Sequence, residues 1–294
     1  MKYSKAASLR LGFLVVLAAL VAMFGKAAMA QSTGPVITDR IPTIGMGVTT
    51  QLPGGGQSLT YSSPVLSARP MGAPNDGEFS AVMEFEGWHN DAGHGINKGD
   101  RQTILTGYTK AMGNNEIAAI LPYEFLHVPG ITTGSSFDDS EITFRHYSFD
   151  ETDPSSLTTV YGAKLIVPTG SPNKFIGVGR WGLAPTVTVS KPRGNSLFYV
   201  GGNYTFIARK SGDILGNPYF LWLGGVTRVQ PKTTVQYELT KFRAANGDGL
   251  TYTRIMVGPR FAVTPTAGIQ VNLKHELEAG SHSTVLSIGY SNRM

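Results

Sequence analysis

The sequence predicts an all-β protein, an antiparallel up-and-down transmembrane β-barrel of about 12 strands that follows a cleaved signal peptide. Three observations predict this fold class: an export signal at the N-terminus, a long series of segments that alternate apolar and polar residues, and an alternation of short and long connections between these segments. They divide the chain into a signal peptide over residues 1–30, a Pro/Gly-rich N-terminal segment over 31–78 and the outer-membrane barrel over 79–294.

The first 30 residues contain the three parts of a secretory signal. Lys2, Lys5 and Arg10 precede the apolar run 11–24, and an Ala-x-Ala cleavage site ends at Ala30. The run is shorter than the roughly 20 residues that a membrane-spanning helix needs, so we expect cleavage rather than anchoring. The chain contains no cysteine, which excludes disulfides and a lipid anchor on cysteine.

The predicted mature chain is almost neutral, because the basic residues of the signal have no acidic counterpart. Without the signal, 21 of the 25 Lys and Arg residues remain against 20 Asp and Glu. No basic surface then argues for nucleic acid as a partner, and we expect none. The 36 glycines and the 10% aromatic residues favour strands over helices.

Alternating segments fill the chain from residue 79 onward. In 268–277, for example, Ile269 and Val271 share one face and Gln270 and Lys274 share the other. The segments are about as long as a tilted strand that crosses a membrane, which needs ~9–11 residues. A soluble periplasmic β-protein would alternate in the same way, so this alternative stays open. The twelve predicted strands begin near Phe79, Arg101, Asn115, Ser140, Leu157, Gly182, Ser196, Asn217, Thr233, Thr251, Gly268 and Ser283.

The connections favour the barrel over the soluble alternative. They are short at 113–115, 191–195 and 229–232, but long at 127–140 and 168–181. Outer-membrane barrels have short periplasmic turns and longer external loops. Aromatic residues are expected on the lipid face near both ends of the strands, as in the girdles of such barrels. The candidates are Trp181, Tyr204 and Phe206 at external ends and Phe198, Phe261 and Tyr290 at periplasmic ends.

The region from about Phe79 to the C-terminus resembles the outer-membrane transporters of the phenol meta-pathway degradation family. The resemblance lies in "VPTG" at 167–170, the loop with Gly177 and Gly179, "GGNYTF" at 201–206, "VQYELTKF" at 235–242 and "RIMVGPRFAVTP" at 254–265. It implies a porin-like barrel in the cell outer membrane, in contact with outer-membrane lipids and associated with uptake of small aromatic or hydrophobic molecules. It implies no catalytic residues.

The loop "IGVGRWG" at 176–182 has the G-x-G-x-x-G spacing of a dinucleotide-binding loop. That motif requires a following helix, whereas an alternating segment with Pro185 follows here, which predicts a strand. We therefore expect Gly177 and Gly179 to let an external loop bend tightly. Arg180 becomes a candidate residue of the barrel mouth and Trp181 a candidate interfacial anchor.

Two further motifs suggest chemistry and are weighed against plainer interpretations. His146 and Ser148 share one face of a strand, like the catalytic pair of outer-membrane phospholipases, and this makes a lipid hydrolase the alternative function. Phe149 stands where those enzymes carry asparagine, so an ordinary strand end is preferred. His89, Asp91 and His94 lie in a polar, Gly-rich stretch that suits a solvated loop tip, and we expect no metal and no other cofactor.

Charged and tyrosine side chains on the polar faces are predicted to line the lumen and to contact a solute. They either fill a closed interior with paired charges or line a narrow polar conduit. The candidates are Glu84, Glu86, Glu124, Arg145, Tyr147, Lys164, Tyr199, Glu238, Arg254, Arg260, Lys274 and Glu276. The sequence thus predicts a passive transporter or channel for a small-molecule solute of hydrophobic or aromatic character, which diffuses through the lumen or leaves it laterally. A filled structural or ligand-binding barrel is the further alternative, and no enzyme activity is expected.

Overall fold

The computed structural model describes thirteen stretches of the chain. They are residues 46–51, 57–62, 77–90, 98–112, 114–130, 132–148, 157–174, 176–193, 195–209, 217–243, 251–264, 267–277 and 281–293. The predicted signal peptide and most of the Pro/Gly-rich segment lie outside them, so the division into domains stays a prediction. Within these stretches, no helix is long and apolar enough to cross a membrane.

Strands make up nearly all of the described structure. Their bounds are β1 Met46–Gln51, β2 Gln57–Ser62, β3 Gly77–Asn90, β4 Lys98–Met112, β5 Asn115–Val128, β6 Thr132–Phe137, β7 Ser140–Ser148, β8 Thr158–Val167, β9 Gly182–Arg193, β10 Ser196–Tyr204, β11 Phe206–Ile207, β12 Tyr219–Gln230, β13 Thr233–Arg243, β14 Thr251–Ala262, β15 Ala267–Glu276 and β16 Ser281–Arg293, with one 3-10 turn, η1, at Pro172–Lys174. The first two strands form a separate antiparallel hairpin.

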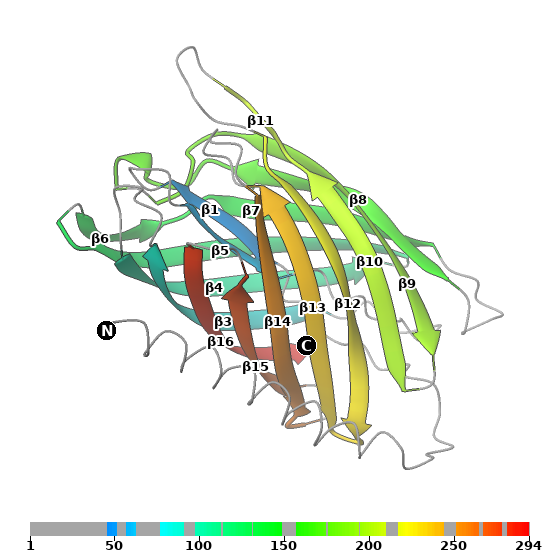
Figure 1. Cartoon of the computed structure of the whole chain (residues 1–294). Coiled ribbons are helices and arrows are strands. Elements are labelled where there is room, and N and C mark those ends of the chain that lie inside the picture. Colours follow the sequence, from blue (N-terminus) through cyan, green and yellow to red (C-terminus); the bar gives the residue numbers. More distant parts are fainter. Residues whose placement is uncertain are drawn as a thin grey trace, which may run out of the picture.

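The other strands form one closed antiparallel barrel (Figure 1). Neighbouring barrel strands pair in chain order, with β5 beside both β6 and β7 and β9 beside both β10 and β11. β16 pairs with β3 in the register Leu286 opposite Phe85, which closes the sheet. The 14 strands of this sheet amount to 12 barrel strands, because β6 continues into β7 and β11 continues β10. Closure pairs the backbone N–H and C=O groups without leaving a sheet edge, as hydrocarbon requires.

The predicted fold class is confirmed, and most strand positions agree with the prediction. Six strands begin at the predicted residue: Asn115, Ser140, Gly182, Ser196, Thr233 and Thr251. The other six begin within three residues of it. Side-chain burial alternates most clearly along β5, where every second residue from Glu116 to Val128 is buried. A period of two therefore carried most of the information about the fold.

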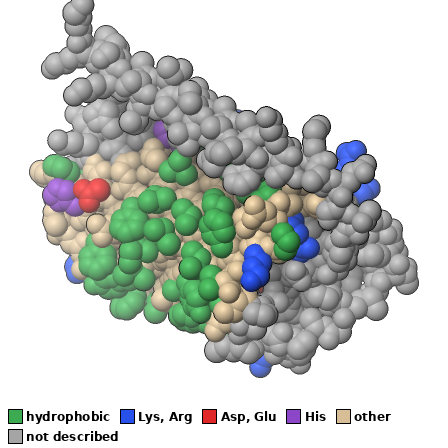
Figure 2. Space-filling model, turned by 90° about the horizontal axis from the view of Figure 1, so that it is seen from below, with side chains coloured by type: hydrophobic (Ala, Val, Ile, Leu, Met, Phe, Trp, Pro, Cys, Tyr) green, Lys and Arg blue, Asp and Glu red, His purple; other side chains and the backbone are tan. Residues whose placement is uncertain are grey.

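The outer surface of the barrel is apolar. Figure 2 shows hydrophobic side chains gathered over the outer face of the described strands. The aromatic residues predicted for the two girdles all point outward: Trp181, Tyr204, Phe206, Phe198, Phe261 and Tyr290 are 39–54% exposed. A surface of this kind suits contact with lipid hydrocarbon and would be costly in water.

One region departs from the prediction. Residues 127–140 were expected to be a connection, but β6 forms within them and pairs with β5 in the register Tyr123 opposite Phe137. Asp138 and Asp139 interrupt the strand before β7 continues it, while β8 ends at Val167 and pairs with β7 and β9 but not with β6. The loop 168–181 lies against β6 instead, since Lys174 Nζ donates to the Ser135 carbonyl at 3.2 Å.

Candidate functional site

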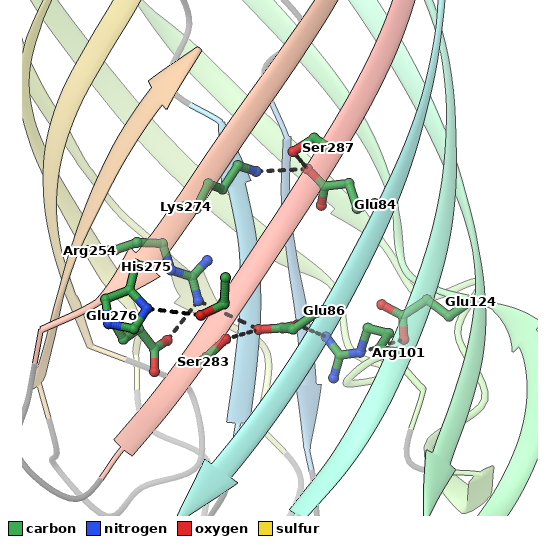
Figure 3. Close-up of polar contacts among 11 residues, drawn as sticks. Glu84, Glu86, Arg101, Glu124, Arg254, Lys274, His275, Glu276, Ser283 and Ser287 are labelled. Carbon is green, nitrogen blue, oxygen red and sulfur yellow. Dashed lines mark hydrogen bonds and ion pairs between the residues drawn. The ribbon is translucent and has the colours of Figure 1, made fainter. Parts of the chain in front are cut away.

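The interior of the barrel has a charged side, which we call the charged wall. It consists of inward side chains from β3, β4, β5, β14, β15 and β16 (Figure 3). All of its ionic side chains are at most 5% exposed. Its members are Glu84, Glu86, Arg101, Glu124, Arg254, Lys274 and Glu276, with the hydroxyls of Ser283 and Ser287.

Carboxylates and bases of the charged wall are interleaved. Glu86 lies 3.8 Å from both Arg101 Nη1 and Arg254 Nη2 and accepts a hydrogen bond from the Ser283 hydroxyl. Arg101 also faces Glu124, with 3.6 Å between Nε and Oε2, and Arg254 Nη2 lies 2.7 Å from Glu276 Oε1. Each of these three carboxylates therefore lies within 4.0 Å of a guanidinium group, as the burial of charge requires.

A second contact in the charged wall crosses a whole strand. Lys274 Nζ on β15 donates to Glu84 Oε1 on β3 at 2.7 Å, and Ser287 on the intervening β16 donates to the same oxygen at 3.0 Å. Three strands around the closure of the barrel are thus joined on the inside. Two more ion pairs lie on inward faces: Arg145 Nη1 with Glu116 Oε1 at 2.6 Å, and Lys164 Nζ with Glu141 Oε1 at 2.7 Å.

The opposite part of the interior is lined by aromatic and aliphatic side chains, which we call the aromatic wall. Its members are Tyr147, Val160, Leu197, Tyr199, Phe220, Trp222, Val226, Phe242 and Tyr252, all at most 8% exposed. The rings of Phe220, Phe242 and Tyr252 stack in series, with centroids 5.6 and 5.4 Å apart. Arg254 lies over the Phe242 ring at 5.3 Å, where the two walls meet.

Glycines make room for two large members of the aromatic wall. Tyr199 crosses β12 above Gly224, where an added Cβ would lie 2.7 Å from the tyrosine hydroxyl. Trp222 lies above Gly201 in the same manner, with 2.6 Å between an added Cβ and Nε1. The Tyr199 hydroxyl thereby reaches Glu238 Oε2 on β13 at 2.9 Å. Tyr199 and Trp222 can therefore occupy these positions only because the opposite residue on the neighbouring strand is glycine.

The glycine loop holds a carboxylate. Asp139 accepts backbone hydrogen bonds from Gly170 at 3.0 Å, Val178 at 2.7 Å and Gly179 at 3.0 Å. Gly177 and Gly179 have positive φ values of 74° and 63°, which confirms the tight bend expected of them. Successive N–H groups in such a turn form a concave anion site, and here the anion is a side chain of the same protein.

The motifs that suggested enzyme or metal chemistry do not form a site within the described residues. The His146 ring faces outward and its Nδ1 lies 2.9 Å from Asn115 Oδ1, whereas no hydrogen bond joins it to Ser148 in the described structure. Asp91, His94 and the side chain of His89 lie outside the described residues. No group of three metal-binding side chains occurs within the described stretches.

The structure brings most of the predicted lumen residues together. Glu84, Glu86, Glu124, Arg254, Lys274 and Glu276 meet in the charged wall, Tyr147 and Tyr199 belong to the aromatic wall, and Arg145, Lys164, Glu238 and Arg260 lie on the inward faces of their strands. Arg180 hydrogen-bonds to the Gly179 carbonyl at 3.1 Å, and Trp181 points outward. Their contact with a solute stays a prediction.

Several interior residues were missed by sequence reasoning. They are Arg101, Glu116, Asp138, Asp139, Glu141, Phe220, Trp222, Phe242 and Tyr252. The period-two pattern contained the signal for most of them, since Arg101 shares its face with Leu105 and Trp222 with Val226. The predicted lumen residues were charged residues and two tyrosines, so the inward Phe220, Trp222, Phe242 and Tyr252 were left without an assignment.

Comparison with known proteins identifies the fold. No protein-family profile and no curated protein matches the sequence, so the family resemblance stays a prediction. The COG4313 outer membrane channel from Pseudomonas putida F1 is 14% identical over 78% of this chain and 100% of its own, with a TM-score of 0.62. The chain has the fold of an outer-membrane channel.

Two other barrels are less similar. The translocator domain of the autotransporter NalP from Neisseria meningitidis matches 76% of this chain and 91% of its own at 13% identity, with a TM-score of 0.49. The KdgM porin matches 72% and 98% at 11% identity, with a TM-score of 0.47. At these values neither bears on the function of this protein.

Proposed function

We propose that the protein is a passive channel of the outer membrane for small apolar or aromatic molecules. The closed barrel, its apolar outer surface and the fold shared with an outer-membrane channel support the location and the class. The predicted signal peptide supports export. Outer-membrane lipids are then the surrounding partner.

The observation that carries the choice of solute is the aromatic wall. A lumen that serves only polar solutes has no need of stacked rings on its inner face, since porin interiors are polar. Phe220, Trp222, Phe242 and Tyr252 instead belong to one buried aromatic cluster inside the barrel, in which the rings of Phe220, Phe242 and Tyr252 stack. Aromatic solutes stack on such rings and bury their own apolar surface there.

In this proposal the charged wall provides the polar side of the lumen. Its ion pairs fix the side chains and keep one side of the interior polar, while the other side offers apolar contact. The predicted lumen residues of both walls form the path, and Gly177, Gly179, Arg180 and Trp181 shape its mouth. The solute moves by diffusion through the lumen or leaves it laterally, and no catalytic step is involved.

Planar-bilayer recording of the purified, folded protein tests this proposal. We expect ion conductance that benzyl alcohol interrupts in a concentration-dependent manner. Trp222→Ala should weaken this block by about fivefold, because a ring inside the barrel contributes ~1 kcal/mol to an aromatic contact. Trp181→Ala is the matched control, since that ring is 51% exposed on the outer surface.

Two outcomes would overturn the proposal. One is the absence of any conductance from protein that runs as a heat-modifiable barrel on gels, which would favour a filled structural barrel. The other is equal loss of block in the two tryptophan variants, which would place the aromatic contact outside the lumen. Fractionation of cells should find the protein in the outer membrane, and recovery in the soluble periplasm would contradict the location.

A further inference from the structure

Glu238 differs from the other buried glutamates in its lack of a basic partner. Within the described part of the chain, no lysine or arginine lies within 4.0 Å of Glu238, although its exposure is only 5%. The positive charge of Lys274 attracts the Glu238 carboxylate over a longer distance, but its ammonium group is hydrogen-bonded to Glu84. Glu84, Glu86, Glu116, Glu124, Glu141 and Glu276 each lie within that distance of a lysine or arginine. A buried carboxylate without a counter-charge is costly.

Hydrogen bonds around Glu238 all point toward its carboxylate. Gln270 donates to Gln236 at 3.1 Å, Gln236 to the Tyr199 hydroxyl at 3.2 Å, and Tyr199 to Glu238 Oε2 at 2.9 Å. The Thr240 hydroxyl donates to Oε1 at 2.7 Å. Such a chain polarises toward a negative acceptor. A carboxylate offers about four lone-pair positions, so these two direct bonds leave room for another donor.

The surroundings of this carboxylate are aromatic and apolar. Across β12, Gly224 stands opposite Glu238, which places the Tyr199 ring beside it, and Trp222 stands opposite Thr240. On the other side, Met256 is the direct neighbour on β14. Tryptophan and tyrosine faces attract ammonium groups, most strongly where water is excluded. Glu238 and these rings therefore combine the two features that recognise an organic cation.

We propose that Glu238, Tyr199 and Trp222 form a subsite for the positively charged group of an organic cation with an aromatic or apolar body, such as an aromatic amine. The inference rests on the proposed channel function and narrows its class of solute. The ammonium supplies the counter-charge that Glu238 lacks, and the body lies along the stacked rings of the aromatic wall. Neutral aromatic molecules use the wall alone, and aromatic carboxylates are disfavoured by Glu238.

Calorimetric titration of the folded, detergent-solubilised protein tests the subsite without relying on transport. The probes are benzylammonium, benzyl alcohol and benzoate, which share a ring and differ in charge. We expect the cation to bind at least tenfold more tightly than benzoate. Glu238→Gln should weaken binding of the cation at least tenfold and change binding of benzyl alcohol by less than twofold. Tyr199→Phe keeps the ring and the carboxylate, and should retain the affinity for the cation within about threefold.

The comparison of the three probes on the unmodified protein is decisive even if a variant fails to fold. Equal binding of benzoate and the cation, or no binding of the cation, would overturn the subsite, and so would an unchanged affinity in a folded Glu238→Gln variant. The failure of the channel proposal is separate, because it is measured as absent conductance in bilayers. A conducting protein that shows no preference for the cation would retain the channel and lose the subsite.

Discussion

Replacement of Lys274 by methionine is the sharpest test of the interior ion pairs. The Lys274 side chain is 1% exposed and that of Glu84 is 5% exposed, and they join β15 to β3 across β16 at the closure of the barrel. Methionine keeps most of the length and volume of lysine but leaves the Glu84 carboxylate buried without its base. Among the described residues, only the hydrogen bond from Ser287 to the Glu84 carboxylate, at 3.0 Å, would remain.

The expected cost follows from this burial. Removal of one partner from a buried ion pair typically costs ~3–5 kcal/mol, because the other charge is left uncompensated. The bond from Ser287 places the expected loss near the lower end, at about 3 kcal/mol, which corresponds to roughly 100-fold in the unfolding equilibrium. Glu84→Met combined with Lys274→Met removes both charges, and should return the free energy of unfolding to within about 1 kcal/mol of the unmodified value.

Urea unfolding of the barrel in lipid vesicles, followed by tryptophan fluorescence and by gel mobility without boiling, measures these values. Lys241→Met is the control, because Lys241 lies on an exposed position of β13 and should change the free energy of unfolding little. A loss below about 1 kcal/mol for Lys274→Met would refute the reasoning. So would a double variant that is less stable than either single one.

Three further substitutions test other parts of the structure. Asp139→Ala should raise amide exchange at Val178 and Gly179 at least tenfold, measured by mass spectrometry with β13 peptides as an unchanged reference, because the loop loses its carboxylate acceptor. Gly224→Ala should lower the urea midpoint, since an added Cβ would lie 2.5 Å from the Tyr237 carbonyl, and an unchanged midpoint would contradict that crowding. Phospholipid hydrolysis by the purified protein should be at background both before and after Ser148→Ala. Hydrolysis by the unmodified protein that Ser148→Ala abolishes would support the hydrolase alternative.

Strand positions could be predicted from the sequence because alternation is a local property. Ile269, Val271 and Leu273 reveal the outward face of β15 without knowledge of its neighbours. The contacts of the interior are not local: Lys274 and Glu84 are 190 residues apart, and only closure of the barrel brings them together. The sequence therefore predicted that Lys274 and Glu84 point inward, but it could not pair them or distinguish Glu238 as the glutamate without a base.

The interior aromatic residues were harder to predict for a different reason. Phe220 and Phe242 alternate with Leu221 and Lys241, so β12 carries large apolar residues on both faces. Where both faces of a strand are apolar, the period-two pattern loses its contrast, and polarity no longer indicates which face is inside. The sequence therefore left Phe220 and Phe242 without an assignment to either face.

The glycine loop shows how a motif can indicate the right physics and the wrong ligand. The spacing at 176–182 is typical of backbone N–H groups that converge on an anion, and Val178 and Gly179 do converge on one. The anion is Asp139, supplied by the break between β6 and β7. An added Cβ would lie 2.8 Å from Asp138 Oδ1 at Gly177 and 2.4 Å from the Pro172 ring at Gly179. Both glycines are therefore needed to bring the loop against that break, and the carboxylate occupies the site that a phosphate would need.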